Sequence, residues 1–179
     1  MHSKSIKKGT ILVARTGLNN DFFSKSVILI TEHSEKGSMG FVINKPTLTP
    51  LDLLFKNYLY YGGPVSTDEL FIFHSRPDII KNNIHVSENI YWALDYEEIK
   101  DCMDKRIVNL EDIRIFKGYC GWDKNQLNQE INHKEWIVLN DTSIDIFKDL
   151  NQELWVDLIK KIGGENLIWL NTPSDPSMN

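Results

Sequence analysis

Two glycine-rich corners constrain the fold of this chain more than any other feature. The first, Tyr60–Val65, reads Tyr-Tyr-Gly-Gly-Pro-Val and follows an apolar stretch. The second, Phe116–Trp122, reads Phe-Lys-Gly-Tyr-Cys-Gly-Trp and runs from another such stretch towards a helix start. Glycines at strand ends remove side chains where a ligand, an aromatic ring or another backbone approaches closely. Two interpretations stay open: the corners line a surface that accepts a ligand, or their glycines only permit tight packing of the neighbouring aromatic residues.

Short, β-branched apolar runs between turn residues predict a sheet. Runs without polar alternation, such as Ile11–Ala14 and Val27–Ile30, fit strands that are covered on both faces. Glu35–Gly40 predicts a hairpin turn, since glycine adopts positive φ without steric penalty. The full set of expected strands is 11–14, 27–30, 41–43, 58–61, 70–74, 113–116, 136–139 and 168–170.

Helix starts are marked by capping signals. Pro50 after Thr49 suits the first helical position, and Asp95–Glu98 and Asp123–Gln126 both resemble capping boxes. A last helix is predicted to end at the glycine pair 163–164. Its apolar face comprises Leu150, Leu154, Trp155, Leu158, Ile159 and Ile162. Because strands and helices do not alternate regularly, we expect a mixed α/β (α+β) fold with a partly antiparallel sheet that can close on itself.

Length and charge restrict the class of protein. The 179 residues suffice for one well-buried core, and no linker divides them, so we expect a single domain over 1–179 with mobile ends at about 1–8 and 171–179. The net charge of −5 argues against direct binding of nucleic acid by this chain. The longest aliphatic runs are too short for a membrane span or a signal-peptide core, which predicts no membrane association and a cytoplasmic location.

No established catalytic or cofactor-binding motif occurs in the sequence. The nucleophile elbow, the phosphate-binding loop and the dinucleotide fingerprint are all missing, so we predict no catalytic residue and no cofactor. Five histidines stand in separate segments without metal-ligand spacing, so no metal site is predicted. Ser38 fits a hairpin better than a nucleophile, because a nucleophile needs an oriented base. Cys120 precedes a helix start, where its thiol could be activated, but a buried, inert thiol is favoured.

A set of motifs in fixed order resembles the YqgE/AlgH family. It comprises Gly9–Ala14, Asp21–Leu29, Glu32-His33, Gly37–Pro46, Tyr61–Val65, Phe116–Trp122 and Gln126-Leu127. The chain departs from the family pattern at Thr16, Cys120 and Asn125, where proline, alanine and glycine are usual. The resemblance implies a small closed β-barrel within a branched sheet flanked by helices. It also implies a cytoplasmic bacterial protein without established catalytic residues, and some members are described as transcriptional regulators connected with alginate synthesis.

Together these observations favour a non-enzymatic binding or regulatory module that acts on an unknown protein or small-molecule partner. Any effect on transcription would then be indirect. Arg15 would neutralise an anionic group, Asn44 would orient polar contacts, and Trp122 would offer a flat apolar platform. The residues expected near the binding surface are Arg15, Asn44, Gly62, Gly63, Pro64, Tyr119, Gly121, Trp122 and Gln126.

The alternative is a hydrolase of unfamiliar type at a sheet edge. Its base would be His33 or His74, paired with a carboxylate such as Glu32 or Asp68. This hypothesis requires the chosen histidine and carboxylate to come within hydrogen-bond reach in a cleft. The sequence gives no indication of the oligomeric state.

Overall fold

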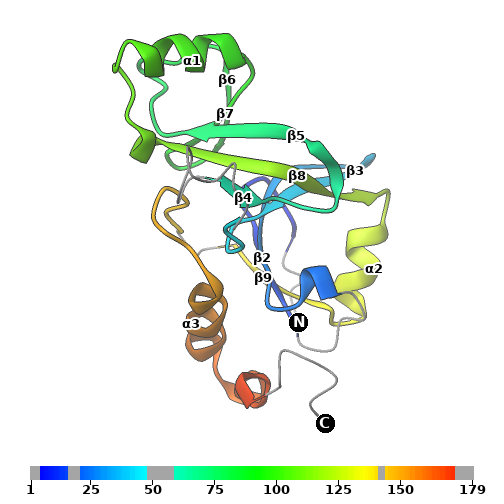
Figure 1. Cartoon of the computed structure of the whole chain (residues 1–179). Coiled ribbons are helices and arrows are strands. Elements are labelled where there is room, and N and C mark those ends of the chain that lie inside the picture. Colours follow the sequence, from blue (N-terminus) through cyan, green and yellow to red (C-terminus); the bar gives the residue numbers. More distant parts are fainter. Residues whose placement is uncertain (1–4, 16–20, 48–58, 141–143, 172–179) are drawn as a thin grey trace.

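The computed structural model describes residues 5–15, 21–47, 59–140 and 144–171 (Figure 1). In these ranges one sheet of nine strands has the order β6-β7-β5-β8-β3-β2-β1-β9, with β4 attached to β8. The β4–β8 ladder is parallel, and the other ladders are antiparallel. The strands are β1 Ile11–Ala14, β2 Val27–Ser34, β3 Gly37–Val42, β4 Leu59–Tyr61, β5 Val65–His74, β6 Asn83–Ser87, β7 Ile90–Ala93, β8 Ile113–Asp123 and β9 Trp136–Leu139.

Helices lie around this sheet, with α1 and α3 at opposite ends of the view in Figure 1. The α-helices are α1 Tyr96–Asp104, α2 Gln126–Asn132 and α3 Gln152–Ile162. The 3₁₀ helices are η1 Asp21–Phe23, η3 Leu110–Asp112 and η4 Gly164–Asn171. The strand predicted at 168–170 is therefore wrong, because these residues belong to η4. The helix start predicted at Thr49 lies outside the described residues.

The capping predictions have mixed outcomes. The side chain of Asp95 caps α1 by accepting hydrogen bonds from the first-turn backbone, as predicted. Gly163 ends α3 with a φ of 68°, also as predicted. The Asp123 cap is wrong, because α2 begins after Asn125, whose φ is 63° and whose side chain forms no cap bond. Only the return bond of the predicted box forms, from the Asp123 N–H to Oε1 of Gln126.

A first core fills the concave face of the sheet. Successive side chains of a strand point to opposite faces of the sheet. Val13 and Leu29 therefore join this core, while the residues next to them in sequence face outwards. Phe41 packs edge-on against Phe73 in it, with ring centroids 4.9 Å apart. Trp155 of α3 covers this core on the side of the helix and is only 1% exposed. The expected apolar face of the last helix is confirmed from Leu154 to Ile162, whereas Leu150 lies before α3 begins.

Two further cores cover the outer face of the sheet. The second core joins Leu12 and Ile28 to Leu127 of α2. The third joins Ile115 of β8 to Ile99 of α1. β1 and the first half of β2 are therefore buried on both sides, which explains why runs such as 11–14 carry no polar alternation.

The sheet curls into a half-barrel but does not close. No ladder within the described residues joins the terminal strands β6 and β9. The chain just before β1 reaches β6 through one hydrogen bond, 2.6 Å from Lys8 Nζ to the carbonyl of His85. A single side-chain bond does not replace a ladder, so the expected closed barrel is wrong. The expected branching is present, because β8 pairs with β3, β4 and β5.

Candidate functional site

The two glycine corners lie against each other at the branch of the sheet. The Gly62 N–H donates to the Lys117 carbonyl at 2.9 Å, and the Gly62 carbonyl accepts from the Val42 N–H at 2.8 Å. A β-carbon at Gly62 would lie 2.3 Å from the Gly118 oxygen, and one at Gly63 would lie 2.0 Å from the carbonyl carbon of Tyr119. Both glycines are buried, so the space beside them is occupied by backbone. Pro64, which follows, is exposed.

An open hollow of about 870 Å³ lies beyond the second corner, at the open end of the half-barrel. We call it the mouth hollow. Residues from the β2–β3 hairpin, β8, the start of β5 and the segment before β1 line it. Its lining includes Lys8, Glu32, Met39, Val65, Tyr119 and Gly121.

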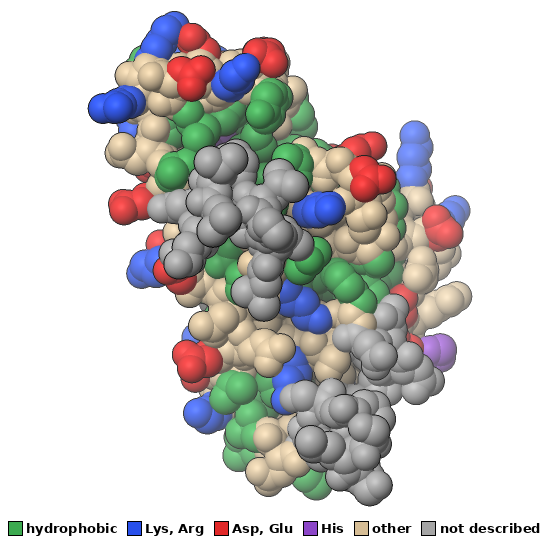
Figure 2. Space-filling view, viewed as in Figure 1, with side chains coloured by type: hydrophobic (Ala, Val, Ile, Leu, Met, Phe, Trp, Pro, Cys, Tyr) green, Lys and Arg blue, Asp and Glu red, His purple; other side chains and the backbone are tan. Residues whose placement is uncertain are grey.

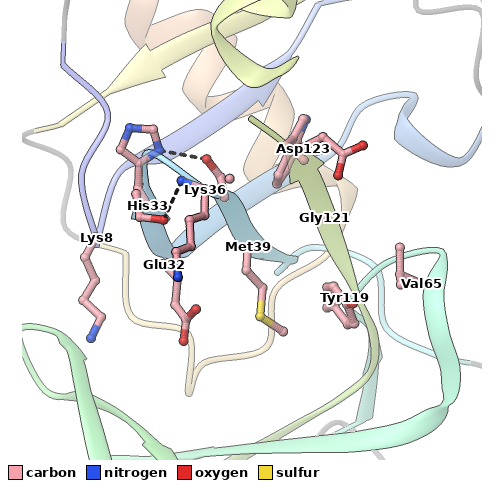
Figure 3. A pocket seen from close by; sticks show the side chains of 13 residues that line it. Lys8, Glu32, His33, Lys36, Met39, Val65, Tyr119, Gly121 and Asp123 are labelled. Atoms are coloured by element: carbon pink, nitrogen blue, oxygen red, sulfur yellow. Dashed lines mark hydrogen bonds between the residues drawn. The ribbon is translucent and has the colours of Figure 1, made fainter. Parts of the chain in front are cut away.

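Strand register decides which side chains enter the mouth hollow. Glu32, Met39 and Gly121 form one row across β2, β3 and β8. The side chains of the neighbouring row, which contains His33 and Ser38, point to the other side of the sheet, although both residues also border the mouth hollow. Figure 3 shows the same division, since Glu32 and Met39 extend to one side of the hairpin and the His33 ring to the other.

The floor of the mouth hollow is apolar and its rim is charged. Tyr119 packs edge-on against Phe71, with ring centroids 5.7 Å apart, and Met39 is half-buried beside the first core. Val65 pairs with Tyr119 and is 37% exposed. Lys8 and Glu32 stand exposed at the rim. The lining thus combines an apolar floor with several charged and polar side chains, and concave surfaces of mixed character at the mouths of β-barrels are common ligand sites.

Of the nine residues predicted for the binding surface, Tyr119, Gly121 and Trp122 line the mouth hollow and the other six do not. Asn44 is fully buried; its Oδ1 accepts from the Val27 N–H at 2.8 Å, and its Nδ2 donates to the Lys25 carbonyl at 2.9 Å. Arg15 follows β1 with its guanidinium 5.0 Å from the centre of the Trp169 ring. Both lie at the end of β2 opposite to Glu32, roughly 15–20 Å along the strand.

Trp122 and Gln126 meet at a carboxylate that the sequence analysis did not single out. Glu130 Oε2 accepts from the indole N–H groups of Trp122 at 2.8 Å and of Trp136 at 2.7 Å. Its Oε1 accepts from Nε2 of Gln126 at 3.0 Å. Trp122 is only 6% exposed and packs in the second core, so it offers no free ring face to the mouth hollow that it lines. The spacing of four residues between Gln126 and Glu130 was the available signal.

The structure does not bring together the groups of the hydrolase hypothesis. His33 Nδ1 lies 2.8 Å from Ser38 Oγ, on the face opposite to Glu32. His74 is fully buried and pairs with Ile113, whereas Ser38 pairs with Trp122 at the other end of β8. Nine residues of strand separate these two positions by roughly 30 Å. His33 and His74 therefore belong to different parts of the molecule, and His74 stands six residues along β5 from Asp68, roughly 20 Å away.

His74 should make stability depend on pH. Burial lowers the pKa of His74 from 6.5 to about 4, and its Nε2 finds no hydrogen-bond partner in the described part of the chain. Between those values the unfolded chain binds more protons than the folded one. The neutral ring therefore contributes stability above pH 6.5 that is lost as the pH falls towards 4.

We expect the free energy of unfolding to fall by about 2 kcal/mol more in the parent than in His74→Asn between pH 7 and pH 4.5. The asparagine oxygen can replace Nδ1 as the acceptor of the Arg76 N–H. Urea unfolding of both proteins at the two pH values measures the difference. Parallel pH profiles would contradict the assignment.

Cys120 is buried, in agreement with the favoured prediction. Its side chain is 1% exposed, and Sγ donates to the Gly62 carbonyl at 3.3 Å. Burial raises the pKa of the Cys120 thiol far above its usual range. Thiolate is the reactive form, so this position does not supply a nucleophile.

No group of three or more His, Cys, Asp or Glu side chains in the described ranges could hold a metal ion. None of the helices in the same ranges has the length and apolar character needed to cross a membrane.

Comparison with known proteins identifies relatives over nearly the whole length. Residues 11–167 match the family model described as AlgH-like. A UPF0301 protein of Cytophaga hutchinsonii is 34% identical over 97% of this chain and 100% of its own. Another, from Parabacteroides distasonis, is 35% identical over 96% of this chain and 91% of its own.

Solved structures share the fold. The solution structure of the AlgH protein from Pseudomonas aeruginosa superposes with a TM-score of 0.71 at 21% identity, covering 97% of this chain and 98% of that one. The crystal structure of protein DIP2367 from Corynebacterium diphtheriae gives a TM-score of 0.73 at 21% identity, covering 96% and 95%.

Proposed function

The chain belongs to the AlgH-like family, and from this premise we propose that it is a non-enzymatic binding module whose ligand or partner occupies the mouth hollow. The observation that supports the proposal most is the apolar floor of Met39 and Tyr119 beneath a charged rim. The sheet, held on both faces, keeps this floor in place. A preformed concave surface of this kind lowers the entropic cost of binding.

We infer that any regulatory effect passes through this ligand or partner and not through contact with DNA. Figure 2 shows acidic and basic side chains interspersed around the α1 end of this face, without a continuous basic stripe there. The net charge of −5 also opposes phosphate binding. A gel shift at low salt that shows no complex is the expected result.

A thermal-shift screen tests the binding function. A ligand at 100 times its dissociation constant should raise the free energy of unfolding by about 2.7 kcal/mol. Val65→Arg should abolish the shift, because it places a long cation at the lining. Leu94→Arg is the matched control, since Leu94 is 53% exposed and lies outside the mouth hollow.

The proposal would be contradicted if no compound of a broad metabolite library shifted the melting temperature and the parent and Val65→Arg captured the same proteins in a pull-down. A shift that both arginine variants lose equally would also count against the mouth hollow.

One contact favours the second candidate function, a hydrolase. His33 and Ser38 form an exposed hydrogen-bonded pair on the outer face of the hairpin, beside a smaller hollow of about 170 Å³. This pair would use Ser38 as the nucleophile and His33 as its base. A fluorophosphonate probe that labels the parent but not Ser38→Ala would support the hydrolase. If the probe at millimolar concentration does not label the parent, the hydrolase function is excluded.

A further inference from the structure

We propose that the mouth hollow takes a ligand with a zwitterionic α-amino-acid head and a large apolar side chain. This inference rests on the proposed function and narrows the chemistry of its ligand. It follows from how the charged groups at the rim are arranged relative to the apolar floor.

Three charged side chains stand close together at one end of the mouth hollow. Lys8, Glu32 and Lys36 all line the mouth hollow and are exposed (Figure 3). Within the described residues, none of the ion pairs involves any of the three. The hollow therefore offers a carboxylate and two ammonium groups in its lining, and a zwitterion supplies the complement of both charges.

Lys8 is the better placed of the two cations. One of its three N–H donors is already bound to the His85 carbonyl at 2.6 Å, which fixes the ammonium across the open side of the half-barrel. The remaining donors can reach a carboxylate without ordering a free side chain. A ligand carboxylate would therefore bind Lys8 while the ligand ammonium binds Glu32.

The apolar floor begins where these charges end. Met39 lies next to Glu32 in the same row, and Gly121 follows without a side chain. Tyr119 and Val65 extend the floor to β5. Three strand spacings from β2 to β5 amount to about 14 Å, which accommodates an aromatic or long aliphatic side chain.

The balance of charges disfavours polyanionic ligands such as nucleoside triphosphates. Two cations, Lys8 and Lys36, line the mouth hollow together with two carboxylates, Glu32 and Asp123. A triphosphate would meet both carboxylates at short range, and like-charge contacts reduce affinity. A zwitterion adds no net charge and avoids this repulsion.

Four probes that share one ring separate the contributions. They are L-phenylalanine, phenethylamine, 3-phenylpropanoate and N-acetylphenylalaninamide, titrated by calorimetry into the full chain. We expect L-phenylalanine to bind at least fivefold more tightly than the uncharged amide. Glu32→Gln should weaken L-phenylalanine and phenethylamine at least fivefold but leave 3-phenylpropanoate unchanged.

The reciprocal variant must show the reciprocal pattern. Lys8→Met should weaken L-phenylalanine and 3-phenylpropanoate at least fivefold and leave phenethylamine unchanged. Lys124→Met, an exposed lysine outside the mouth hollow, should change none of the affinities. Equal binding of all four probes, or equal sensitivity of all probes to both variants, would overturn the assignment.

Failure of this inference is distinguishable from failure of the proposed function. If no probe binds but another compound stabilises the parent and not Val65→Arg, the amino-acid ligand is wrong and the binding function stands. If no compound or partner protein binds in a way that depends on Val65, both the amino-acid ligand and the binding function are wrong.

Discussion

Gly63→Ala should lower the free energy of unfolding by about 3 kcal/mol or more, enough to leave little folded protein at 37 °C. The new methyl carbon would lie 2.0 Å from the carbonyl carbon of Tyr119 and 2.4 Å from the Cys120 nitrogen. These are backbone atoms held in the β3–β8 ladder, so they cannot yield by a rotamer change. Relief requires β8 to separate from the corner at residues 62–63, which opens the branch of the sheet.

Gly121→Ala is the matched control within the second corner. Its methyl group would meet only the Tyr119 ring, at 3.2 Å, and a ring edge can shift by a few tenths of an ångström. We expect a loss of about 1 kcal/mol or less. Urea unfolding followed by circular dichroism measures both variants. Equal stability of Gly63→Ala and Gly121→Ala would show that the close backbone contact at Gly63 does not restrict the fold.

Local sequence signals predicted the elements that are marked by a continuous apolar run or by a periodic apolar face. The run 136–139 is β9 itself, and the apolar face of the last helix with its terminal glycine gave α3 correctly. The hairpin β6–β7 was missed, because Asn83–Ser87 contains no continuous apolar run and only Val86 in it is buried. The segment 168–170 was misassigned because three apolar residues without periodicity fit a strand and a 3₁₀ helix equally well.

The site shows the same limit at longer range. The sequence left open whether the two corners bind a ligand or only permit close packing, and the backbones of Gly62 and Gly118 are in contact. It did not indicate that the open space would lie further along β8. That outcome depends on strand register, which places Glu32 beside Met39 across two strands. Register is fixed by tertiary packing and has no local signature in one chain.

Whether the sheet closes could not be derived from the sequence either. A closed barrel needs a ladder between its terminal strands, and whether one forms depends on strand number, tilt and stagger together. Here the gap is spanned by Lys8, a residue that reads as part of a solvated arm in the sequence. The incomplete closure is also what leaves the mouth hollow open.

The second large effect is expected at Arg114, a cation that is 1% exposed on β8. Its Nε donates to the Ile146 carbonyl at 2.6 Å, and Nη2 donates to the Lys148 carbonyl at 2.7 Å. The guanidinium also lies 4.6 Å from the centre of the Tyr60 ring, whose hydroxyl accepts from the Leu150 N–H at 3.0 Å. Arg114 and Tyr60 thus hold the segment that leads into α3.

Arg114→Met should lower the free energy of unfolding by about 3 kcal/mol, because it keeps the apolar stem but leaves the two carbonyls without these donors. Tyr60→Phe, which removes only the bond to Leu150, should lose about 1 kcal/mol. Urea unfolding ranks the two variants, and hydrogen exchange should show the extra loss in α3, because that helix closes the first core through this segment. If Arg114→Met unfolds at the parent midpoint while α3 keeps its protection, the packing of Trp155 alone is sufficient to dock the helix, and the buried arginine is dispensable for stability.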